Sequence, residues 1–123
     1  MKFSVSLKKN YEFRRIYSKG RSIGTHVLVV YARKNRLPIN RVGITVTAKV
    51  GGAVVRNLLR RRIREIYRLN EDSLFSGFDI VIVARVKSRY VSYQDLERAF
   101  LYGCGKLGLK KNSAGSTTGS VSV

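Results

Sequence analysis

Cysteine, histidine and proline are nearly absent from this chain of 123 residues, which contains one of each and no tryptophan. The single cysteine, Cys104, excludes an internal disulfide and fits a reducing compartment. Since His26 is the only histidine, a structural zinc site built from four Cys or His ligands cannot be assembled. His26 also has no obvious catalytic partner near it in the sequence.

Acidic residues are also scarce. The chain has 7 Asp and Glu, and they are scattered along it rather than clustered. A metal-dependent nuclease usually groups carboxylates to hold Mg²⁺, and no Walker loop, nucleophile elbow or Cys/His pair is present. We therefore identify no catalytic residue and no metal ligand in this polypeptide, and expect the chemistry to lie elsewhere.

Long hydrophobic runs are missing too. No stretch approaches the roughly 20 apolar residues of a transmembrane span, and the first ten residues lack the apolar region of a signal peptide. We expect a soluble cytoplasmic protein with no membrane partner. The composition predicts one domain over residues 1–109 and a disordered polar tail over 110–123.

Positive charge is what the chain has in excess. It contains 25 Lys and Arg, has a formal charge of +18, and has a pI near 10.9. Such a charge indicates a polyanionic partner, nucleic acid first of all, although an acidic membrane surface would attract it as well.

The arginines concentrate in one predicted helix, residues 53–70. Six arginines and Asn57 fall within residues 56–68, with Glu65 as the only acid. At about 100° per residue, one arc of the helix is almost purely cationic and the opposite arc is apolar. The cationic arc holds Arg56, Asn57, Arg60, Arg61, Arg64 and Arg68, and the apolar arc holds Val55, Leu58, Leu59, Ile63, Ile66 and Leu69. Like charges at i,i+4 repel, so this face is suited to binding phosphate, which arginine grips bidentately. Arg62 falls inside the apolar arc and must reach an edge.

The remaining pattern predicts an α+β sandwich with the order α-β-β-α-β-α. A first helix is expected from the N-cap Asn10 to Ser18, with Gly20 as a left-handed stop. Apolar strands are expected at 27–33 and 42–47, joined as a hairpin, and at 78–86. A final helix is expected after the cap Ser92.

Three aromatic residues form the second functional signal. Phe13 and Tyr17 are i,i+4 neighbours on the first helix, and Tyr31 lies in the middle of a strand. Helical aromatics more often belong to a core than to a ligand site. Beside so much positive charge, however, they are also suited to stacking on the bases of single-stranded RNA.

The sequence resembles a known family over about residues 7–107. Residues 49–65, KVGGAVVRNLLRRRIRE, closely resemble the RNR signature of the bacterial ribonuclease P protein subunit. Residues 7–20 resemble that family's first helix, and 41–46 and 79–85 resemble the strands on either side of the RNR segment. Arg62 and Gly52 depart from the family pattern, where an apolar and a polar residue respectively are common.

The resemblance implies a role beside a catalytic RNA that removes the 5′ leader from precursor tRNA and itself positions Mg²⁺. It implies a leader-binding cleft lined by Phe13, Tyr17 and Tyr31. It also implies a mainly antiparallel sheet and a rare left-handed βαβ crossover. The residues expected to face the catalytic RNA are Lys49, Arg56, Asn57, Arg60, Arg61, Arg64 and Arg68.

Two other functions compete with this one. A basic ribosomal or RNA-chaperone protein would be equally cationic and would have no effect on leader removal. A self-sufficient nuclease would cleave precursor tRNA without an added RNA.

Overall fold

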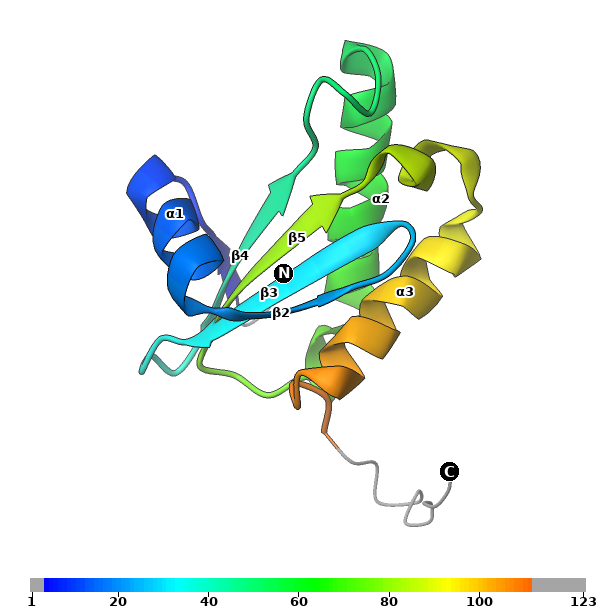
Figure 1. Ribbon diagram of the computed structural model, residues 1–123. Helices are drawn as coiled ribbons and strands as arrows, with labels where there is room; N and C mark the ends of the chain where they lie inside the picture. Colours follow the sequence, from blue (N-terminus) through cyan, green and yellow to red (C-terminus); the bar gives the residue numbers. More distant parts are fainter. Residues whose placement is uncertain (1–3, 112–123) are drawn as a thin grey trace.

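The computed structural model describes residues 4–111, which form a five-stranded sheet with α1 on one face and α2 and α3 on the other (Figure 1). The helices are α1 (Asn10–Lys19), α2 (Ala53–Asn70) and α3 (Tyr93–Lys106), with short 3₁₀ turns η1 (Glu71–Ser73) and η2 (Val86–Tyr90). The strands are β1 (Ser4–Ser6), β2 (Arg21–Gly24), β3 (Leu28–Lys34), β4 (Asn40–Thr45) and β5 (Phe78–Ala84). The α+β class and the order of the six main elements are confirmed. The short strands β1 and β2 were not predicted.

The strand order is β1-β4-β5-β3-β2. The β1–β4 and β4–β5 pairs are parallel, and the β3–β5 and β2–β3 pairs are antiparallel, so the sheet is mixed rather than mainly antiparallel as expected. The predicted hairpin between β3 and β4 is wrong, because β5 lies between them. The chain's hairpin joins β2 to β3 instead. Strand β5 takes the centre because it is apolar on both faces and its residues 79–82 are all buried.

The connection from β4 through α2 to β5 is left-handed. Strands β4 and β5 run in the same direction, with α2 against one face of the sheet (Figure 1). Viewed from the α2 side with both strands pointing upward, β5 lies to the left of β4. About 98% of such connections have the opposite hand. The crossover therefore agrees with the family resemblance and not with the general rule.

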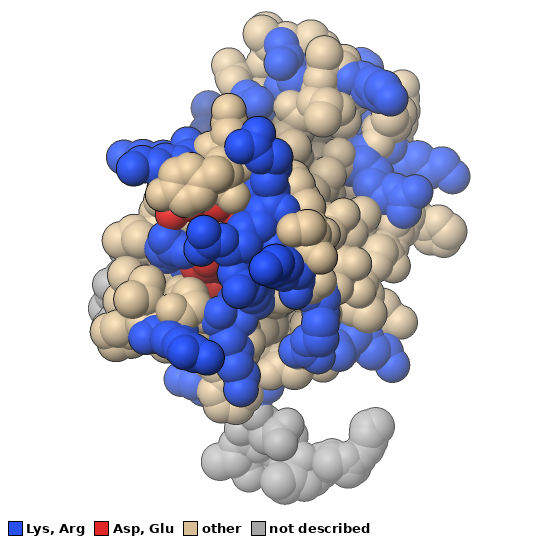
Figure 2. Space-filling model, turned by 60° about the vertical axis from the view of Figure 1, so that its left-hand side comes forward, with Lys and Arg blue, Asp and Glu red and all other residues tan. Residues whose placement is uncertain are grey.

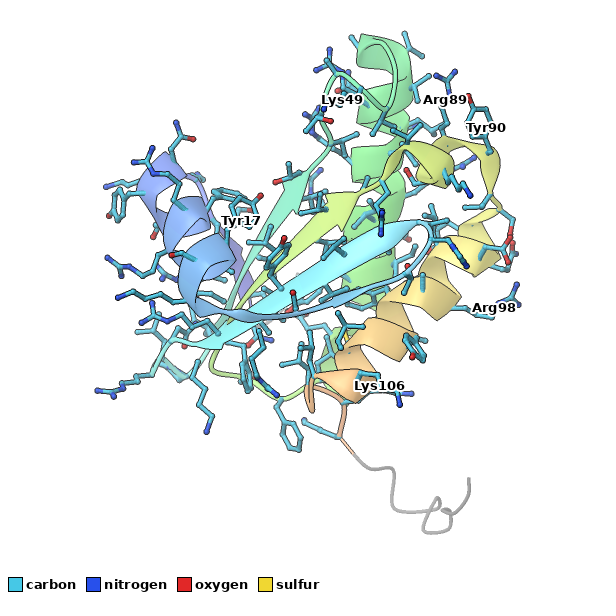
Figure 3. The ribbon with its side chains drawn as sticks, in the orientation of Figure 1. Tyr17, Lys49, Arg89, Tyr90, Arg98 and Lys106 are labelled. Atoms are coloured by element: carbon cyan, nitrogen blue, oxygen red, sulfur yellow. The ribbon has the colours of Figure 1, made fainter. Side chains whose placement is uncertain are left out.

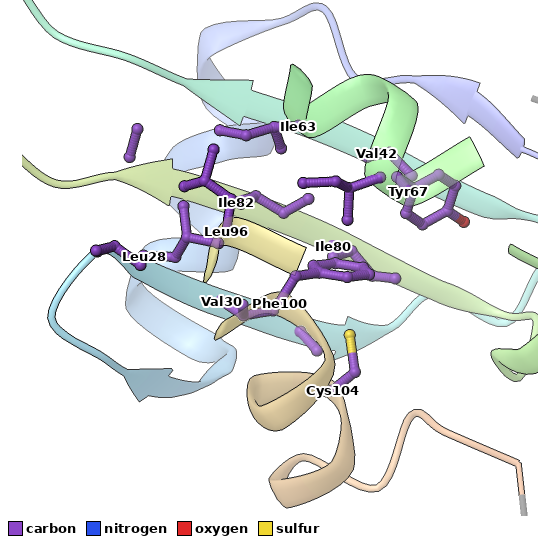
Figure 4. Packing of buried hydrophobic residues seen from close by; sticks show 14 of the residues in the cluster. Leu28, Val30, Val42, Ile63, Tyr67, Ile80, Ile82, Leu96, Phe100 and Cys104 are labelled. Carbon is purple, nitrogen blue, oxygen red and sulfur yellow. The ribbon is translucent and has the colours of Figure 1, made fainter. Parts of the chain in front are cut away.

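Two hydrophobic clusters hold the layers together. The larger one packs the sheet against α2 and α3, with Ile80 and Ile82 of β5 among side chains such as Ile63 and Phe100 (Figure 4). The rings of Tyr67 and Phe100 meet edge to face, with centroids 6.2 Å apart. The smaller cluster packs Leu7, Ile16 and Val81 between α1 and the opposite face.

The ends of α1 differ from the predicted ones. Its N-cap is Lys9 rather than Asn10, and the Glu12 carboxylate accepts a 3.2 Å hydrogen bond from the Lys9 backbone N–H. Gly20 has φ −81°, so it is not a left-handed stop. Glycine is required there because a Cβ would lie 2.6 Å from the Ile16 carbonyl oxygen. The predicted cap of α3 is confirmed, since Ser92 Oγ accepts from the Asp95 N–H at 3.1 Å.

The buried face of α2 is turned slightly from the predicted arc. Leu69 is 56% exposed, whereas Tyr67 is fully buried. The Tyr67 hydroxyl can be buried because it hydrogen-bonds Ser4 Oγ at 2.7 Å and accepts from Asn40 Nδ2 at 3.1 Å. Strands β1 and β4 therefore supply the partners that place this residue inside.

Two residues that the sequence assigned to the tail, Lys110 and Lys111, pair with the segment that follows α2. Lys110 forms a β-bridge with Leu74, and the Lys111 N–H donates to the Ser73 carbonyl at 2.8 Å. The remainder of the predicted tail, 112–123, lies outside the described residues.

Candidate nucleic-acid interface

Helix α2 presents its cationic residues to solvent because its opposite face is packed on the sheet. The buried residues of α2, which form this packed face, are Leu59, Ile63, Ile66 and Tyr67. Of the predicted RNA-facing residues, Asn57, Arg61, Arg64 and Arg68 are exposed, and Arg56 and Arg60 are half-buried. Lysine and arginine are also spread over the side of the molecule on which α1 lies, where acidic surface is visible only as small patches (Figure 2).

The predicted residue Lys49 lies just before α2, exposed in the turn that leads into the helix (Figure 3). Gly51 permits a tight path here, since a Cβ would lie 3.0 Å from the Val55 side chain. Gly52 caps α2 in an extended conformation with no side-chain cap. The first turn of α2 contains no acid that would interrupt the positive charge. Lys49 therefore extends the cationic face of the helix into the turn that precedes it.

Two arginines of this face are held against the protein. Arg60 Nη2 donates to the Val46 carbonyl and Nη1 to Asn57 Oδ1, both at 3.3 Å. Among the described residues, Arg56 Nε is buried without a hydrogen-bond partner. A buried N–H without an acceptor costs free energy, so hydrogen bonding within the described residues does not explain the position of this atom.

The other arginines differ in whether an acidic side chain of the protein neutralises their charge. Arg68 donates to both carboxylate oxygens of Glu65, at 2.9 and 2.8 Å, and this hydrogen bonding lowers the pKa of Glu65. Within residues 4–111, neither Arg61 nor Arg64 forms an ion pair. We therefore expect Arg68 to offer less charge to an anion than Arg61 or Arg64. Arg62 is half-buried, and no contact within the described residues explains why an arginine stands at this position.

The three predicted cleft aromatics come together between α1 and the sheet. The ring centroids of Phe13 and Tyr17 are 6.4 Å apart, and those of Tyr17 and Tyr31 are 5.0 Å apart with the rings edge to face. The Tyr17 hydroxyl lies 2.9 Å from Thr45 Oγ1, which ties α1 to the end of β4. Tyr17 lies on the side of α1 that faces the sheet (Figure 3).

A cavity of about 240 Å³ connects this aromatic cluster to α2. Its lining includes Phe13 of α1 and both Arg60 and Arg64 of α2. Gly43 of β4 forms part of the floor, and the Phe13 ring rests on it so closely that a Cβ would lie 2.4 Å from the ring. The lining residues are Ser6, Leu7, Phe13, Val42, Gly43, Ile44, Arg60, Arg64 and Tyr67. A cavity lined by both apolar side chains and two arginines suits a nucleobase and its phosphate.

Sequence reasoning missed Gly43 and the ion-pair network that fixes α1. A glycine inside a strand often marks the close approach of another group, so Gly43 carried a usable signal. Arg41 of β4 joins Glu12 at 2.6 Å and Asp79 at 2.7 Å, and its pKa is raised, first of all by the hydrogen bond to Asp79. The network holds the start of α1 over β4 and β5, and so helps to set the position of Phe13.

The described residues offer few ligands for a metal. Across residues 4–111, no group of three or more His, Cys, Asp or Glu side chains is placed to hold an ion. The same part of the chain contains no helix with the length and apolar character needed to cross a membrane.

Comparisons with known proteins identify the family of the chain. A family model described as Ribonuclease P matches residues 1–108. The ribonuclease P protein component of Natranaerobius thermophilus is 42% identical over 97 residues, covering 79% of this chain and 84% of the relative. That of Lachnoclostridium phytofermentans is 46% identical over 99 residues, covering 80% and 85%.

Solved structures of RNase P proteins have the same fold as this chain. The RNase P protein of Staphylococcus aureus has a TM-score of 0.80 at 30% identity, covering 86% of this chain and 97% of that one. The RNase P protein of Thermotoga maritima has a TM-score of 0.73 at 35% identity, covering 79% and 92%. The chain therefore belongs to the ribonuclease P protein family, the protein component of an endoribonuclease whose catalysis is carried out by an RNA subunit.

Proposed function

We propose that this chain assists a catalytic RNA in removing the 5′ leader from precursor tRNA by binding both RNAs at once. The observation that carries the proposal is the cavity between α1 and α2. Arg60 and Arg64 reach it from the cationic helix, and Phe13 reaches it from the aromatic cluster. A leader held by the aromatic cluster would lie beside the RNA held by α2.

The surface proposed for the catalytic RNA comprises the exposed side of α2 and the turn before it. A folded RNA presents closely spaced phosphates, which relieve the repulsion among arginines stacked at i,i+4. Asn57 can donate and accept, so it can also pair with a ribose hydroxyl. The proposed residues are Lys49, Arg56, Asn57, Arg60, Arg61, Arg64 and Arg68.

The surface proposed for the leader is the cluster of Phe13, Tyr17 and Tyr31. Single-stranded RNA is bound by stacking its bases on aromatic rings along a basic groove, which contributes roughly 1–3 kcal/mol per base. Tyr17 is partly exposed, and its hydroxyl is oriented by Thr45, so its ring is presented in one position.

We propose that Mg²⁺ is held mainly by the RNA subunit and that this chain supplies no catalytic residue. Glu12 of α1 and Asp79 of β5 are both engaged by Arg41. The chain would act in the cytoplasm together with its two RNA partners.

Reconstitution tests the proposal directly. The chain is mixed with the RNA subunit of a bacterial ribonuclease P at low Mg²⁺, and leader cleavage is followed with time. The protein should accelerate cleavage. Unchanged cleavage would favour a ribosomal or chaperone role, and cleavage by the protein alone would identify a self-sufficient nuclease.

Tyr17→Ala tests the leader surface. It should weaken binding of precursor tRNA about tenfold, the loss of one stacked base, and leave mature tRNA unchanged. Tyr17→Phe keeps the ring and should retain most of the affinity. Tyr11→Ala is the matched control, because Tyr11 is an exposed tyrosine on the same helix outside the cluster. Equal losses for precursor and mature tRNA would remove Tyr17 from the leader site.

Arg61→Ala and Arg60→Ala test the surface for the catalytic RNA. Each should weaken binding of the RNA subunit and reduce the slope of log K against log salt by about one. Arg98→Ala on α3 is the control, since Arg98 is paired with Asp95 and lies away from α2. A slope unchanged from the unmodified protein would argue against a phosphate contact.

A further inference from the structure

The short turn η2 carries a large aromatic side chain that the fold does not use. Tyr90 is 74% exposed, and the Arg89 guanidinium lies over its ring, 5.2 Å from the centroid. A tyrosine this exposed contributes little to the core. A cation on one face of the ring leaves the other face open to a second planar group.

Arg89 and Tyr90 are held in place by the backbone beneath them. Arg89 Nη1 donates to the Val50 carbonyl at 3.1 Å and lies against Gly51, where a Cβ would be 3.2 Å away. Ser88 is fully buried, and its hydroxyl donates to the Arg85 carbonyl at 2.6 Å. The Arg89 side chain is therefore fixed against the turn that leads into α2.

This position is continuous with the surface proposed for RNA. Lys49 precedes the Val50 carbonyl that Arg89 binds, and Lys49 and Arg89 flank the N-terminal end of α2, with Tyr90 beyond Arg89 (Figure 3). Lys87 adds a further positive charge on η2. The nearest acid along the chain, Asp95, is engaged by Arg98.

We propose that Arg89 and Tyr90 form a binding site for one unpaired nucleotide of RNA, an inference that rests on the proposed RNA-binding role. The base stacks on the face of Tyr90 opposite Arg89, and the remaining N–H groups of Arg89 donate to the adjacent phosphate. The positive surroundings favour a polyanion, and an exposed ring beside a fixed guanidinium matches the stacking sites of single-stranded nucleic-acid binders. The nucleotide belongs either to the RNA subunit or to precursor tRNA.

The chain supplies a matched control for this site. Tyr102 on α3 is 55% exposed, and Lys106 Nζ lies 5.7 Å from its ring centroid. It shares the exposure and the neighbouring cation of Tyr90, but it lies on α3, away from the start of α2. Tyr102→Ala therefore removes an equivalent ring without touching the proposed site.

The experiment measures binding of the full chain to the RNA subunit of a bacterial ribonuclease P and, separately, to precursor tRNA, over a range of salt concentrations. Tyr90→Ala should weaken one of the two about tenfold, the loss of one stacked base, without changing the salt slope. Tyr90→Phe should retain the affinity. Arg89→Gln should lower the salt slope by about one. Thermal melting should show Tyr90→Ala to be as stable as the unmodified chain.

The RNA that loses affinity identifies the source of the nucleotide, and either result supports the site. If Tyr90→Ala matches Tyr102→Ala on both RNAs, the site is refuted while the proposed function stands. If the unmodified chain binds neither RNA, the proposed function fails and this inference fails with it.

Discussion

Gly43→Ala should disturb the proposed leader surface from within the sheet. A Cβ on Gly43 would lie 2.4 and 2.5 Å from two carbons of the Phe13 ring, and 3.4 Å from Leu7 Cβ. Ordinary carbon contacts lie near 3.5–4.0 Å, so the ring must move by about 1 Å. Leu7 can stay where it is.

Gly43→Ala should lower the stability of the fold because it overpacks the contact with Phe13. Inserting a methyl group into a packed site typically costs about 1–3 kcal/mol, which for a domain of this size corresponds to a melting temperature lower by about 5–15 °C. Because Phe13 packs near Tyr17, its displacement should also weaken binding of precursor tRNA more than binding of mature tRNA. Gly105→Ala is the control. Its Cβ would meet nothing within 4 Å in α3, and it should stabilise by about 0.5–1 kcal/mol.

A double-mutant cycle isolates the contact. Gly43→Ala is measured by urea unfolding in the unmodified chain and again in a Phe13→Ala background. The smaller side chain should remove most of the cost of Gly43→Ala, giving a coupling free energy of about 1–3 kcal/mol. Equal costs in the two backgrounds would refute the argument that Phe13 rests on Gly43.

Three further predictions address the charges and the buried thiol. Glu65→Gln frees Arg68 and should tighten binding of the RNA subunit and steepen its salt dependence; weaker binding would contradict this. Arg41→Met leaves the buried Asp79 without its cation and should cost about 3 kcal/mol in urea unfolding, whereas a change below about 0.5 kcal/mol would match an ordinary surface substitution. Burial raises the pKa of the Cys104 thiol to about 12, so iodoacetamide at pH 8 should label it only after unfolding. Since the unfolded thiol ionises first, stability should also fall as the pH rises from about 9 towards 12, and rapid labelling of the folded chain would refute both statements.

Local patterns predicted the helices well. Helix α2 spans the predicted residues 53–70, because a strong 3.6-residue period follows two glycines. Local patterns could not predict which strands pair with each other. Adjacent strands usually pair, and only the burial of β5 on both faces, between β3 and β4, reverses that preference.

In the candidate site, too, local sequence patterns predicted some features, while others depend on neighbouring strands. The three aromatics were grouped correctly, because the spacing of Phe13 and Tyr17 sets their shared face and Tyr31 lies on the strand opposite them. The contact of Phe13 with Gly43 and the burial of Tyr67 instead of Leu69 both depend on β4 and β1. A helical wheel contains no information about those strands.

The central position of β5 has a consequence for biosynthesis. Strands β3 and β4 do not pair with each other, and both require Phe78–Ala84 between them. While the ribosome has released only the first 70 residues, the arginine helix therefore has no completed surface to dock on. A nascent chain stalled before residue 78 should be degraded readily by proteases, and resistance should arise only once that last strand has emerged from the exit tunnel.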